Sequence, residues 1–362
     1  MPVYNGPYAK DYTRSRHMPT DPYTPLAPGP TLRTPTTPAP PRQMVVCATN
    51  GQFHSYVNLE KIDELIDQAD TFLWLDLQNP QDHEIDLLRE EFKFHPLAIE
   101  DATRHHERPK LEAYDNYYFM VFYAIGYDTP RRRLSGQPIG LFIGANYIVS
   151  VHQGEIATID ETIKRWQANA TEFGQDAGAL LYTLLDAIVD DYFPVIDQLA
   201  ERVEDIEEQI FERYSEDALQ DVFGLKRDLL AVRRVVAPER DVLNVLIRRE
   251  VPIFERNSIL YLQDVYDHIV RITDSIDTYR DLLSSALDAF LSVQSNRLNQ
   301  IVKVLTICSI VLMTDALIAG IYGMNFEFMP ELHWQYGYPF ALGLMLVLSV
   351  GLVAFFRWRK WV

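Results

Sequence analysis

Residues 301–325 read IVKVLTICSIVLMTDALIAGIYGMN, and this stretch decides the architecture of the chain. It is an apolar run interrupted by Lys303 near its start and by Asp315. A helix of about 20 apolar residues crosses the roughly 30 Å hydrocarbon core of a bilayer. A second apolar run, Pro339–Phe356, follows after a short loop. The sequence therefore predicts a two-helix transmembrane hairpin, with spans at 301–322 and 339–357 and an extracytoplasmic loop at 323–338.

The charges beside the hairpin give it an orientation. Basic residues flank both spans on the side of the preceding domain: Arg297, Lys303, Arg357, Arg359 and Lys360. The loop contains no Lys or Arg, but it does contain Glu327, Glu331 and His333. Because Lys and Arg are enriched on the cytoplasmic side of membrane proteins, we expect both termini in the cytoplasm. This places the basic tail at 358–362 inside the cell and the hairpin in the cell (inner) membrane.

Upstream of the first span, a helical periodicity runs from Ser258 to Gly320 without Pro or Gly between them. At about 1.5 Å per residue this helix would be roughly 95 Å long, far longer than a globular helix. We therefore expect one pore helix at 258–322 that leaves the soluble part and enters the bilayer. One face of it has an apolar heptad repeat, which predicts a packing seam. The repeat consists of Val265, Ile269, Ile272, Ile276, Tyr279, Leu283, Ala286, Phe290 and Val293.

The opposite face of the same helix is small and polar. It reads Asp281, Ser285, Asp288, Ser292, Ser295 and Asn299, and continues in register as Val302, Thr306, Ser309, Met313, Ala316 and Gly320. A solvated face is the ordinary interpretation of a polar stripe. The short side chains and the continuation into the membrane favour a pore line instead. One hairpin cannot enclose a pore, so this interpretation requires a homo-oligomer.

The rest of the chain divides into three segments. Residues 1–42 contain 11 of the 21 prolines and predict a disordered tail. Residues 43–155 mix short β-type runs with helical patterns and predict a cytoplasmic α/β domain. Residues 156–257 have helical periodicity and predict a cytoplasmic helical domain. The expected strands are Met44–Ala48, Phe72–Leu77, Tyr117–Tyr127, Pro138–Ile143 and Tyr147–His152, and the expected helices are Glu84–Phe92, Pro96–Thr103, Gly178–Arg213 and Ala218–Ile247.

The composition of the chain limits the classes of partner and of function that it can have. The chain has 51 acidic and 33 basic residues and a formal net charge of −18, which argues against nucleic acid and favours cations, although simple solubility has the same signature. Two cysteines, one within an apolar run, do not suggest a disulfide framework or a Cys-based metal site. A membrane-anchored enzyme has weak support, because no phosphate loop or catalytic metal motif stands out. The adjacent His105, His106 and Glu107 cannot all face one point on a helix.

Several segments resemble the CorA-type magnesium/cobalt transporter family. The resemblance covers about residues 44–362, and its most specific part is Tyr322-Gly323-Met324-Asn325, at the outer end of the first of two C-terminal spans. The other matching segments are His95–Asp101, Arg108–Lys110, Leu185–Phe193, Lys303–Ile307, Ile318–Phe326 and Met329–Leu332.

The resemblance implies a funnel-shaped homo-oligomer, a pentamer, with Gly323, Met324 and Asn325 as selectivity filter. A ring of Asn325 amide oxygens would accept hydrogen bonds from the waters of Mg²⁺ without stripping them. By position the pore is lined by Asp288, Asn299, Val302, Leu305 and Met313, and the stripe adds Ala316. The apolar members would gate by dewetting, or they are plain lipid-span residues. Glu327 and Glu331 would concentrate cations, or they only solubilise the loop.

The resemblance also implies a regulatory Mg²⁺ site between subunits. In it Asp101 of one subunit faces Asp264 of the next, with Glu100, Asp186, Asp267 and His268 nearby. Carboxylates brought close together repel unless a divalent ion bridges them. The alternative is that these acids form ordinary surface ion pairs. Mg²⁺ is then both transported and regulatory, and we expect no organic cofactor.

The leading functional prediction is a passive channel for uptake of Mg²⁺, and also of Co²⁺ or Ni²⁺. The alternative is a zinc-transporting or cation-exporting member of the same superfamily, in which Ile tends to replace the residue at Met324. The chain departs from the family at Thr314-Asp315-Ala316, where the family usually has Pro-Leu-Thr. Asp315 lies about 140° from the pore stripe on an ideal helix. We expect it to point away from the pore, toward the second span or a neighbouring subunit, with Ser349 and the Thr314 of an adjacent subunit as candidate partners; the alternative is a pore ligand.

Overall fold

The computed structural model describes residues 40–49, 52–56, 62–66, 71–104, 108–128, 133–168, 177–210, 216–248, 256–325 and 334–359, with residues 32, 130, 254, 329, 330 and 361. Apart from residues 32 and 40–42, the expected Pro-rich tail lies outside the described residues. The same holds for His105, His106, Glu107, Glu327, Glu331, His333 and Lys360.

The N-terminal part is built around a seven-stranded sheet of order β2-β1-β3-β7-β6-β5-β4. Only β3 and β7 pair in parallel among the described strands, and the other pairs are antiparallel. The middle strands β3 and β7 are buried throughout, which explains their continuous apolar runs. The strands are β1 (Arg42–Thr49), β2 (Gln52–Tyr56), β3 (Thr71–Gln78), β4 (Lys110–Ala113), β5 (Tyr118–Asp128), β6 (Arg133–Ile143) and β7 (Tyr147–His152).

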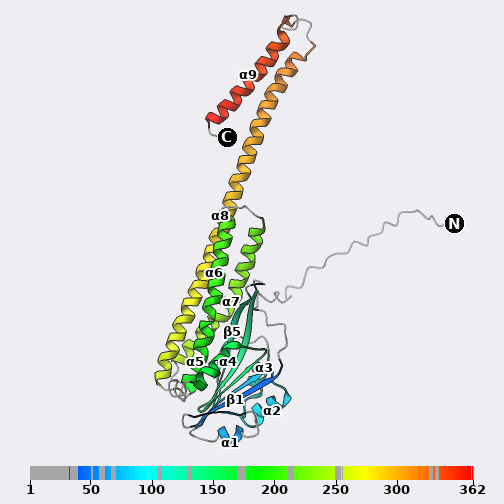
Figure 1. Ribbon diagram of the computed structural model, residues 1–362. Helices are drawn as coiled ribbons and strands as arrows, with labels where there is room; N and C mark the ends of the chain where they lie inside the picture. Colours follow the sequence, from blue (N-terminus) through cyan, green and yellow to red (C-terminus); the bar gives the residue numbers. More distant parts are fainter. Residues whose placement is uncertain are drawn as a thin grey trace, which may run out of the picture.

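Helices cover both faces of this sheet. On one face, α4 (Ala157–Ala168) places Trp166 against Trp74 of β3, with the ring centroids 6.2 Å apart. On the other face, α3 (Pro96–Thr103) approaches β6 so closely that a Cβ at Gly140 would lie 2.7 Å from the Ala102 Cβ. Two further short helices, α1 (Ile62–Ile66) and α2 (Asp82–Glu90), lie beside the sheet (Figure 1).

The second part is a bundle formed by α5 (Ala177–Asp190), α6 (Tyr192–Glu208), α7 (Glu216–Arg248) and the first half of α8 (Arg256–Tyr322). The sequence predicted one helix over Gly178–Arg213, and this was wrong, since the chain breaks at Asp191. Pro194 lacks the N–H that would bond to the Asp190 carbonyl, and its ring crowds that carbonyl. The predicted seam of α8 is confirmed over most of its length. Its buried members are Val265, Ile269, Ile272, Ile276, Leu283, Ala286 and Phe290.

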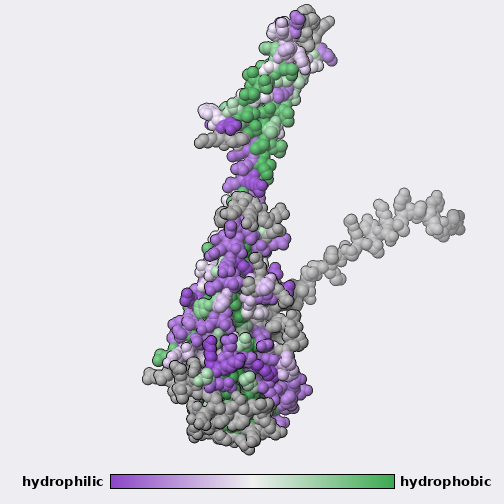
Figure 2. All heavy atoms as spheres, viewed as in Figure 1, coloured by the Kyte–Doolittle hydropathy of each residue, from purple (hydrophilic) through white to green (hydrophobic). Residues whose placement is uncertain are grey.

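The long helix α8 has 67 residues, about 100 Å at 1.5 Å per residue, and it projects far beyond the bundle (Figure 1). It continues through Thr314-Asp315-Ala316, where the family resemblance would place a proline. A loop then leads to α9 (Gly337–Trp358), which folds back along the upper part of α8. Both helices are long and apolar enough to cross a membrane, and Figure 2 shows their hydrophobic surface above a hydrophilic domain. The predicted helical hairpin is confirmed.

Candidate ion path and metal-binding cluster

The upper half of α8 presents two kinds of surface. The side turned to α9 buries Ile307 and Ile318, which are 7% and 8% exposed. The predicted pore residues lie on the surface that α9 leaves uncovered. These exposed residues are Asp288, Asn299, Val302, Leu305, Met313 and Ala316. These residues belong to a broad exposed surface, which also includes Ile301, Leu312 and Leu317, and this surface runs along one continuous helix from the bundle to the outer loop.

The Ser and Thr hydroxyl groups within this span donate to carbonyl groups of their own helix. Thr306 donates to the Val302 carbonyl and Ser309 to the Leu305 carbonyl, each at 2.8 Å. Unsatisfied donors are costly inside a bilayer, and these bonds remove that cost. The hydroxyl oxygens keep lone pairs that can accept hydrogen bonds from water. Such side chains suit the wall of a path for a hydrated ion.

Asp315 points toward the second span. The Ser349 hydroxyl on α9 lies 3.0 Å from each Asp315 carboxylate oxygen and donates to them. The expectation that Asp315 points away from the stripe is therefore confirmed, and of the two candidate partners the structure shows Ser349 on α9. The carboxylate ties the two spans together and is directed away from the line that contains Met313 and Ala316.

The outer end of α8 turns tightly into the Gly323-Met324-Asn325 loop. The Gly323 N–H donates to the Ala319 carbonyl at 2.9 Å, and the Met324 N–H donates to the Ile321 carbonyl at 3.2 Å. A Cβ at Gly323 would lie 3.1 Å from the Ala319 oxygen, so glycine eases this turn. Asn325 is exposed directly after it. The negative end of the helix dipole also points to this loop and favours cations there.

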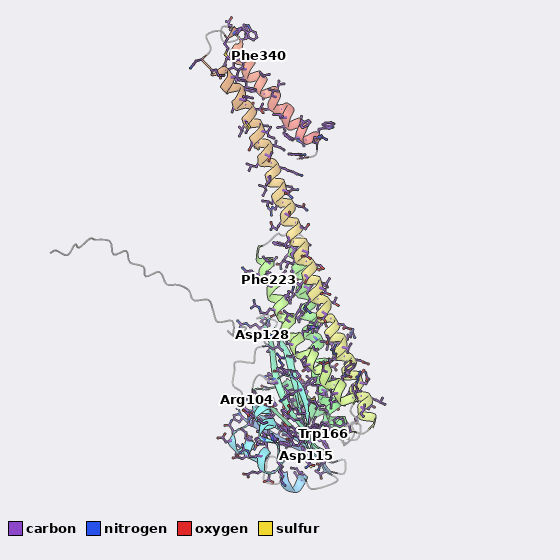
Figure 3. The ribbon with its side chains drawn as sticks, turned by 180° about the vertical axis from the view of Figure 1, so that it is seen from behind. Arg104, Asp115, Asp128, Trp166, Phe223 and Phe340 are labelled. Atoms are coloured by element: carbon purple, nitrogen blue, oxygen red, sulfur yellow. The ribbon has the colours of Figure 1, made fainter. Side chains whose placement is uncertain are left out.

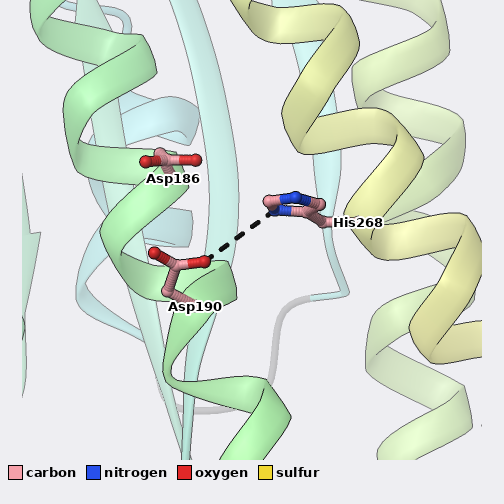
Figure 4. Close-up of side chains that lie close together, drawn as sticks. All are labelled: Asp186, Asp190 and His268. Carbon is pink, nitrogen blue, oxygen red and sulfur yellow. Dashed lines mark ion pairs between the residues drawn. The ribbon is translucent and has the colours of Figure 1, made fainter.

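At the other end of α8, three side chains form a cluster that a metal ion could join. Asp186 and Asp190 project from α5 toward His268 of α8 (Figure 4), and one ligand atom from each lies within 4.8 Å of the others. The His268 Nδ1 atom is buried without a hydrogen-bond partner in the described structure. It lies 3.8 Å from the Asp190 Oδ1 atom, beyond direct hydrogen-bonding distance.

The electrostatics of this cluster favour a bound cation. Burial raises the pKa of Asp186 above its ordinary value, and the nearby Asp190 carboxylate raises it further. Asp264, one turn before His268, acts in the same direction. Carboxylate oxygens suit Mg²⁺, whereas imidazole nitrogen suits Co²⁺, Ni²⁺ and Zn²⁺. The donor set therefore fits a divalent ion and does not restrict it to Mg²⁺.

The sequence interpretation missed Asp190 as a site residue. The sequence does contain an indication of it, because Asp186 and Asp190 are four residues apart in a predicted helix and therefore share a face. The helix break at Asp191 leaves Asp190 as the last residue of α5, opposite His268.

Two of the remaining predicted regulatory residues, Glu100 and Asp101, lie apart from this cluster, whereas Asp264 and Asp267 are within one turn of His268 on α8. Glu100 and Asp101 are on α3, where Glu100 pairs with Arg104 and Asp101 pairs with Lys110. Figures 1 and 3 place α3 on one side of the domain and the first turns of α8, with the exposed Asp264 and Asp267, on the other. Within one chain the structure therefore brings together Asp186 and His268, while Asp101 and Asp264 face different sides.

Comparisons with known proteins agree with this arrangement. Residues 69–359 match the family described as CorA-like Mg²⁺ transporter protein. The putative metal ion transporter YfjQ of Bacillus subtilis is 37% identical over 299 residues, which cover 82% of this chain and 92% of that protein. The cobalt/magnesium transport protein CorA of Thermotoga maritima is 38% identical over 272 residues, covering 75% of this chain and 78% of that protein.

A solved structure has the same fold. The complete structure of the CorA magnesium transporter from Methanocaldococcus jannaschii superposes with a TM-score of 0.76. It covers 88% of this chain and 98% of its own chain at 24% sequence identity. The likeness therefore includes the α/β domain, the long helix and the two C-terminal apolar helices.

Proposed function

Because this chain belongs to the family of CorA-like Mg²⁺ transporter proteins, we propose that it is a passive channel for the uptake of Mg²⁺. The family is one of integral membrane proteins that transport divalent cations. One observation carries the finer proposal. A single unbroken helix, α8, presents an exposed line of small, polar and apolar residues from the cytoplasmic bundle to Asn325.

The proposed assembly is a homo-oligomer, a pentamer, in the cell (inner) membrane with both termini in the cytoplasm. One hairpin cannot surround an ion, so several copies of α8 must line the path. The exposure of Val302, Leu305 and Met313, at 51%, 65% and 72%, supports this assembly because nothing in the described part of the chain covers them. Exposed aromatic residues at the ends of α9, such as Tyr338 and Trp358, suit the two membrane interfaces.

Selectivity is assigned to the outer loop. Mg²⁺ holds its waters tightly and prefers oxygen in octahedral geometry. A ring of Asn325 amides accepts hydrogen bonds from those waters while the ion stays hydrated. A ring of carboxylates would bind the ion too strongly for rapid release. Gly323 and Met324 position the Asn325 side chain by closing the turn after α8.

Closure is assigned to the apolar part of the line. Val302, Leu305 and Met313 from several copies would form a constriction that excludes water when narrow. Asn299 and Asp288 continue the line on its cytoplasmic side as polar surface that rehydrates and attracts cations. Ala316 widens the line between the constriction and the outer mouth.

Regulation is assigned to carboxylates at subunit boundaries. Asp101 belongs to α3 and Asp264 to the first turns of α8, and these two segments lie on different sides of one chain, an arrangement that suits contact between neighbouring subunits. Glu100 and Asp267 lie beside them, and the cluster of Asp186, Asp190 and His268 lies one turn from Asp264. Oxygen donors of this kind fit Mg²⁺. Bound Mg²⁺ would bridge the subunits and hold the ring closed.

The test is ion flux into proteoliposomes containing the purified protein. We expect Mg²⁺ entry without ATP, competition by Co²⁺ and Ni²⁺, and weaker competition by Zn²⁺. Protein-free liposomes and the Asn325→Ala variant are the controls. Preferential Zn²⁺ flux, or transport that requires an outward ion gradient, would replace this proposal with the zinc-transporting or exporting alternative.

A further inference from the structure

The Asp101 carboxylate already has a cation beside it. The Lys110 Nζ atom, at the start of β4, lies 2.5 Å from the Asp101 Oδ2 atom. The same ammonium group lies 3.0 Å from the Oε1 atom of Glu112. Only 27% of the Lys110 side chain and 20% of the Asp101 side chain are exposed. Asp101 is therefore a partly buried ion pair and not a free carboxylate.

The surroundings of Lys110 hold the ammonium in place. Glu112 is two residues further along β4, so both side chains project from the same face of the strand. The Tyr114 hydroxyl donates to the other Glu112 oxygen, Oε2, at 3.1 Å. The Lys110 ammonium also lies 5.7 Å from the centroid of the Phe119 ring, within the range of a cation–π contact.

The Lys110 side chain carries a positive charge at physiological pH. Burial lowers the pKa of Lys110, but hydrogen bonds to Asp101 and Glu112 outweigh burial and raise the pKa above its ordinary value. The ammonium is therefore present throughout the physiological pH range. By contrast, Asp264 is exposed, and no ion pair involving it is found in the described part of the chain. Only one of the two carboxylates proposed to bridge subunits has its own counter-ion.

We propose that Lys110 is a tethered competitor of the regulatory divalent cation at Asp101, and that it sets the Mg²⁺ concentration needed for closure. This inference rests on the regulatory site of the proposed function. A divalent ion that coordinates Asp101 Oδ2 must displace an ammonium held at 2.5 Å from that atom. The displaced ammonium keeps Glu112 as a partner, so the exchange leaves no partly buried charge unpaired.

The experiment uses the full-length protein in lipid nanodiscs and measures the Mg²⁺ concentration that gives half-maximal protection from limited proteolysis. Lys110→Gln removes the competitor, and the half-maximal Mg²⁺ concentration should fall about fivefold, the upper range for a solvent-accessible ion pair. Glu112→Gln removes the alternative partner of the ammonium, strengthens its hold on Asp101 and should raise that concentration. Lys110→Arg retains the cation and should leave it near wild type.

The opposite shifts separate competition from a structural role, because simple destabilisation would move both variants in the same direction. Thermal melting of each variant checks that the domain is folded. The inference is overturned if the half-maximal Mg²⁺ concentration is unchanged in both Lys110→Gln and Glu112→Gln, or if it shifts in the same direction in both. The proposed regulatory site would stand in either case. A wild-type protein without Mg²⁺-dependent protection would overturn the regulatory site itself, which is a distinguishable result.

Discussion

The two halves of α8 are one continuous helix in two different environments. From Val265 to Phe290 its apolar stripe is buried by neighbouring helices of the same chain. From Ile301 to Tyr322 only a narrow strip against α9 is covered, and 11% of the most apolar window of α8 is buried, as is 6% of that of α9. The lower half completes its core within one chain. The membrane half depends on lipid and on other copies.

This difference changes which forces matter. In the bundle, removal of apolar surface from water is the main stabilising term, at about 25 cal/mol per Å². In the bilayer, lipid tails are as apolar as leucine, so helix association depends on close packing and hydrogen bonds. Asp315 and Ser349 provide such a bond. Substitutions at the buried positions of the lower half should therefore change stability, and substitutions at the exposed positions of the upper half should leave the stability of the lower half unchanged.

The largest expected effect is at the outer end of the membrane half. Asn325→Ala removes the amide that we propose accepts hydrogen bonds from hydrated Mg²⁺, and Mg²⁺ flux in proteoliposomes should drop to the background of protein-free liposomes. The oligomer should remain assembled, because Asn325 is exposed after the end of α8. Size-exclusion chromatography with light scattering checks the assembly. Wild-type flux in this variant would refute the proposal that Asn325 forms the selectivity filter.

The second-largest expected effect is on ion flux through the membrane half, and it comes from a substitution in the lower half of α8. In the proposed regulatory site, Asp264→Lys supplies a permanent cation opposite Asp101 of the neighbouring subunit, so the ring should stay closed without Mg²⁺. We expect flux to fall about tenfold or more, within the usual range of allosteric coupling. Protection from proteolysis should become independent of Mg²⁺. Asp274→Lys, at another exposed position of α8, is the matched control. The prediction fails if Asp264→Lys still needs Mg²⁺ for protection.

Two substitutions, one in each half of α8, test whether the halves contribute differently to the free energy of unfolding. Ile276 lies in the seam and is fully buried, so Ile276→Ala should lower the free energy of unfolding of the cytoplasmic part by about 2–5 kcal/mol. Leu312 in the membrane half is 69% exposed, and Leu312→Ala should leave that free energy unchanged. Urea unfolding followed by tryptophan fluorescence measures both. Equal effects would mean that the two halves are not independent.

Much of this architecture was predictable because it is encoded locally. The seam of α8 and both membrane helices follow from hydrophobic period and length, which act through neighbouring residues. The direction of Asp315 away from the stripe followed from helix geometry, since it lies about 140° from the stripe, but geometry along one helix left Ser349 as one of two candidate partners. Five strands and the helices α2 and α3 were predicted near their observed positions.

The misses depend on non-local or short signals. The strands β2 and β4 and the helix α1 have only four or five residues each, too few to establish a period. The break at Asp191 depended on Pro194, which was overlooked within a strong helical pattern. The contact of Asp190 with His268 joins residues 78 positions apart on different helices, and a period along one helix does not report it.

A smaller effect is expected from a buried acid in the cytoplasmic part. Glu239 of α7 is fully buried, and its Oε1 atom accepts from the Tyr123 N–H at 2.9 Å. The Tyr192 hydroxyl has one proton but lies 2.5 Å from the Tyr123 carbonyl oxygen and 3.0 Å from Glu239 Oε1. A protonated Glu239 supplies the second proton for these oxygens. Burial accordingly raises the pKa of Glu239 well above its ordinary value.

The sign of the resulting pH effect follows from linkage. The folded state keeps the Glu239 proton above the ordinary pKa, whereas the unfolded state releases it. The stability contributed by the neutral acid is therefore fully present at low pH and declines as pH rises above about 4.5, by up to about 1.4 kcal/mol per pH unit. Glu239→Gln should remove this decline and gain stability relative to wild type with rising pH. Urea unfolding at several pH values measures the difference, and a constant difference would contradict the assignment.

The smallest expected effect is at Asp315. This acidic residue lies in the membrane half, so a role for it in ion selection would change the contrast drawn between the two halves of α8. If its carboxylate were a pore ligand, the membrane half would select ions through a buried charge as well as through Asn325. The structure instead directs both carboxylate oxygens to Ser349 on α9. Asp315→Asn keeps the shape and leaves an amide oxygen that accepts from the Ser349 hydroxyl. We therefore expect Mg²⁺ flux within about twofold of wild type, because only the hydrogen bond with Ser349 is altered and its acceptor is retained, and an unchanged order of ion preference. Ser349→Ala is the matched variant: it leaves the carboxylate without this donor and should loosen the two spans more than Asp315→Asn does. Competition flux assays with Mg²⁺, Co²⁺ and Na⁺ measure the outcome. A collapse of Mg²⁺ flux in Asp315→Asn, or a shift toward monovalent ions, would place the carboxylate in the ion path, and the hydrogen bond between the spans would then be only its resting position.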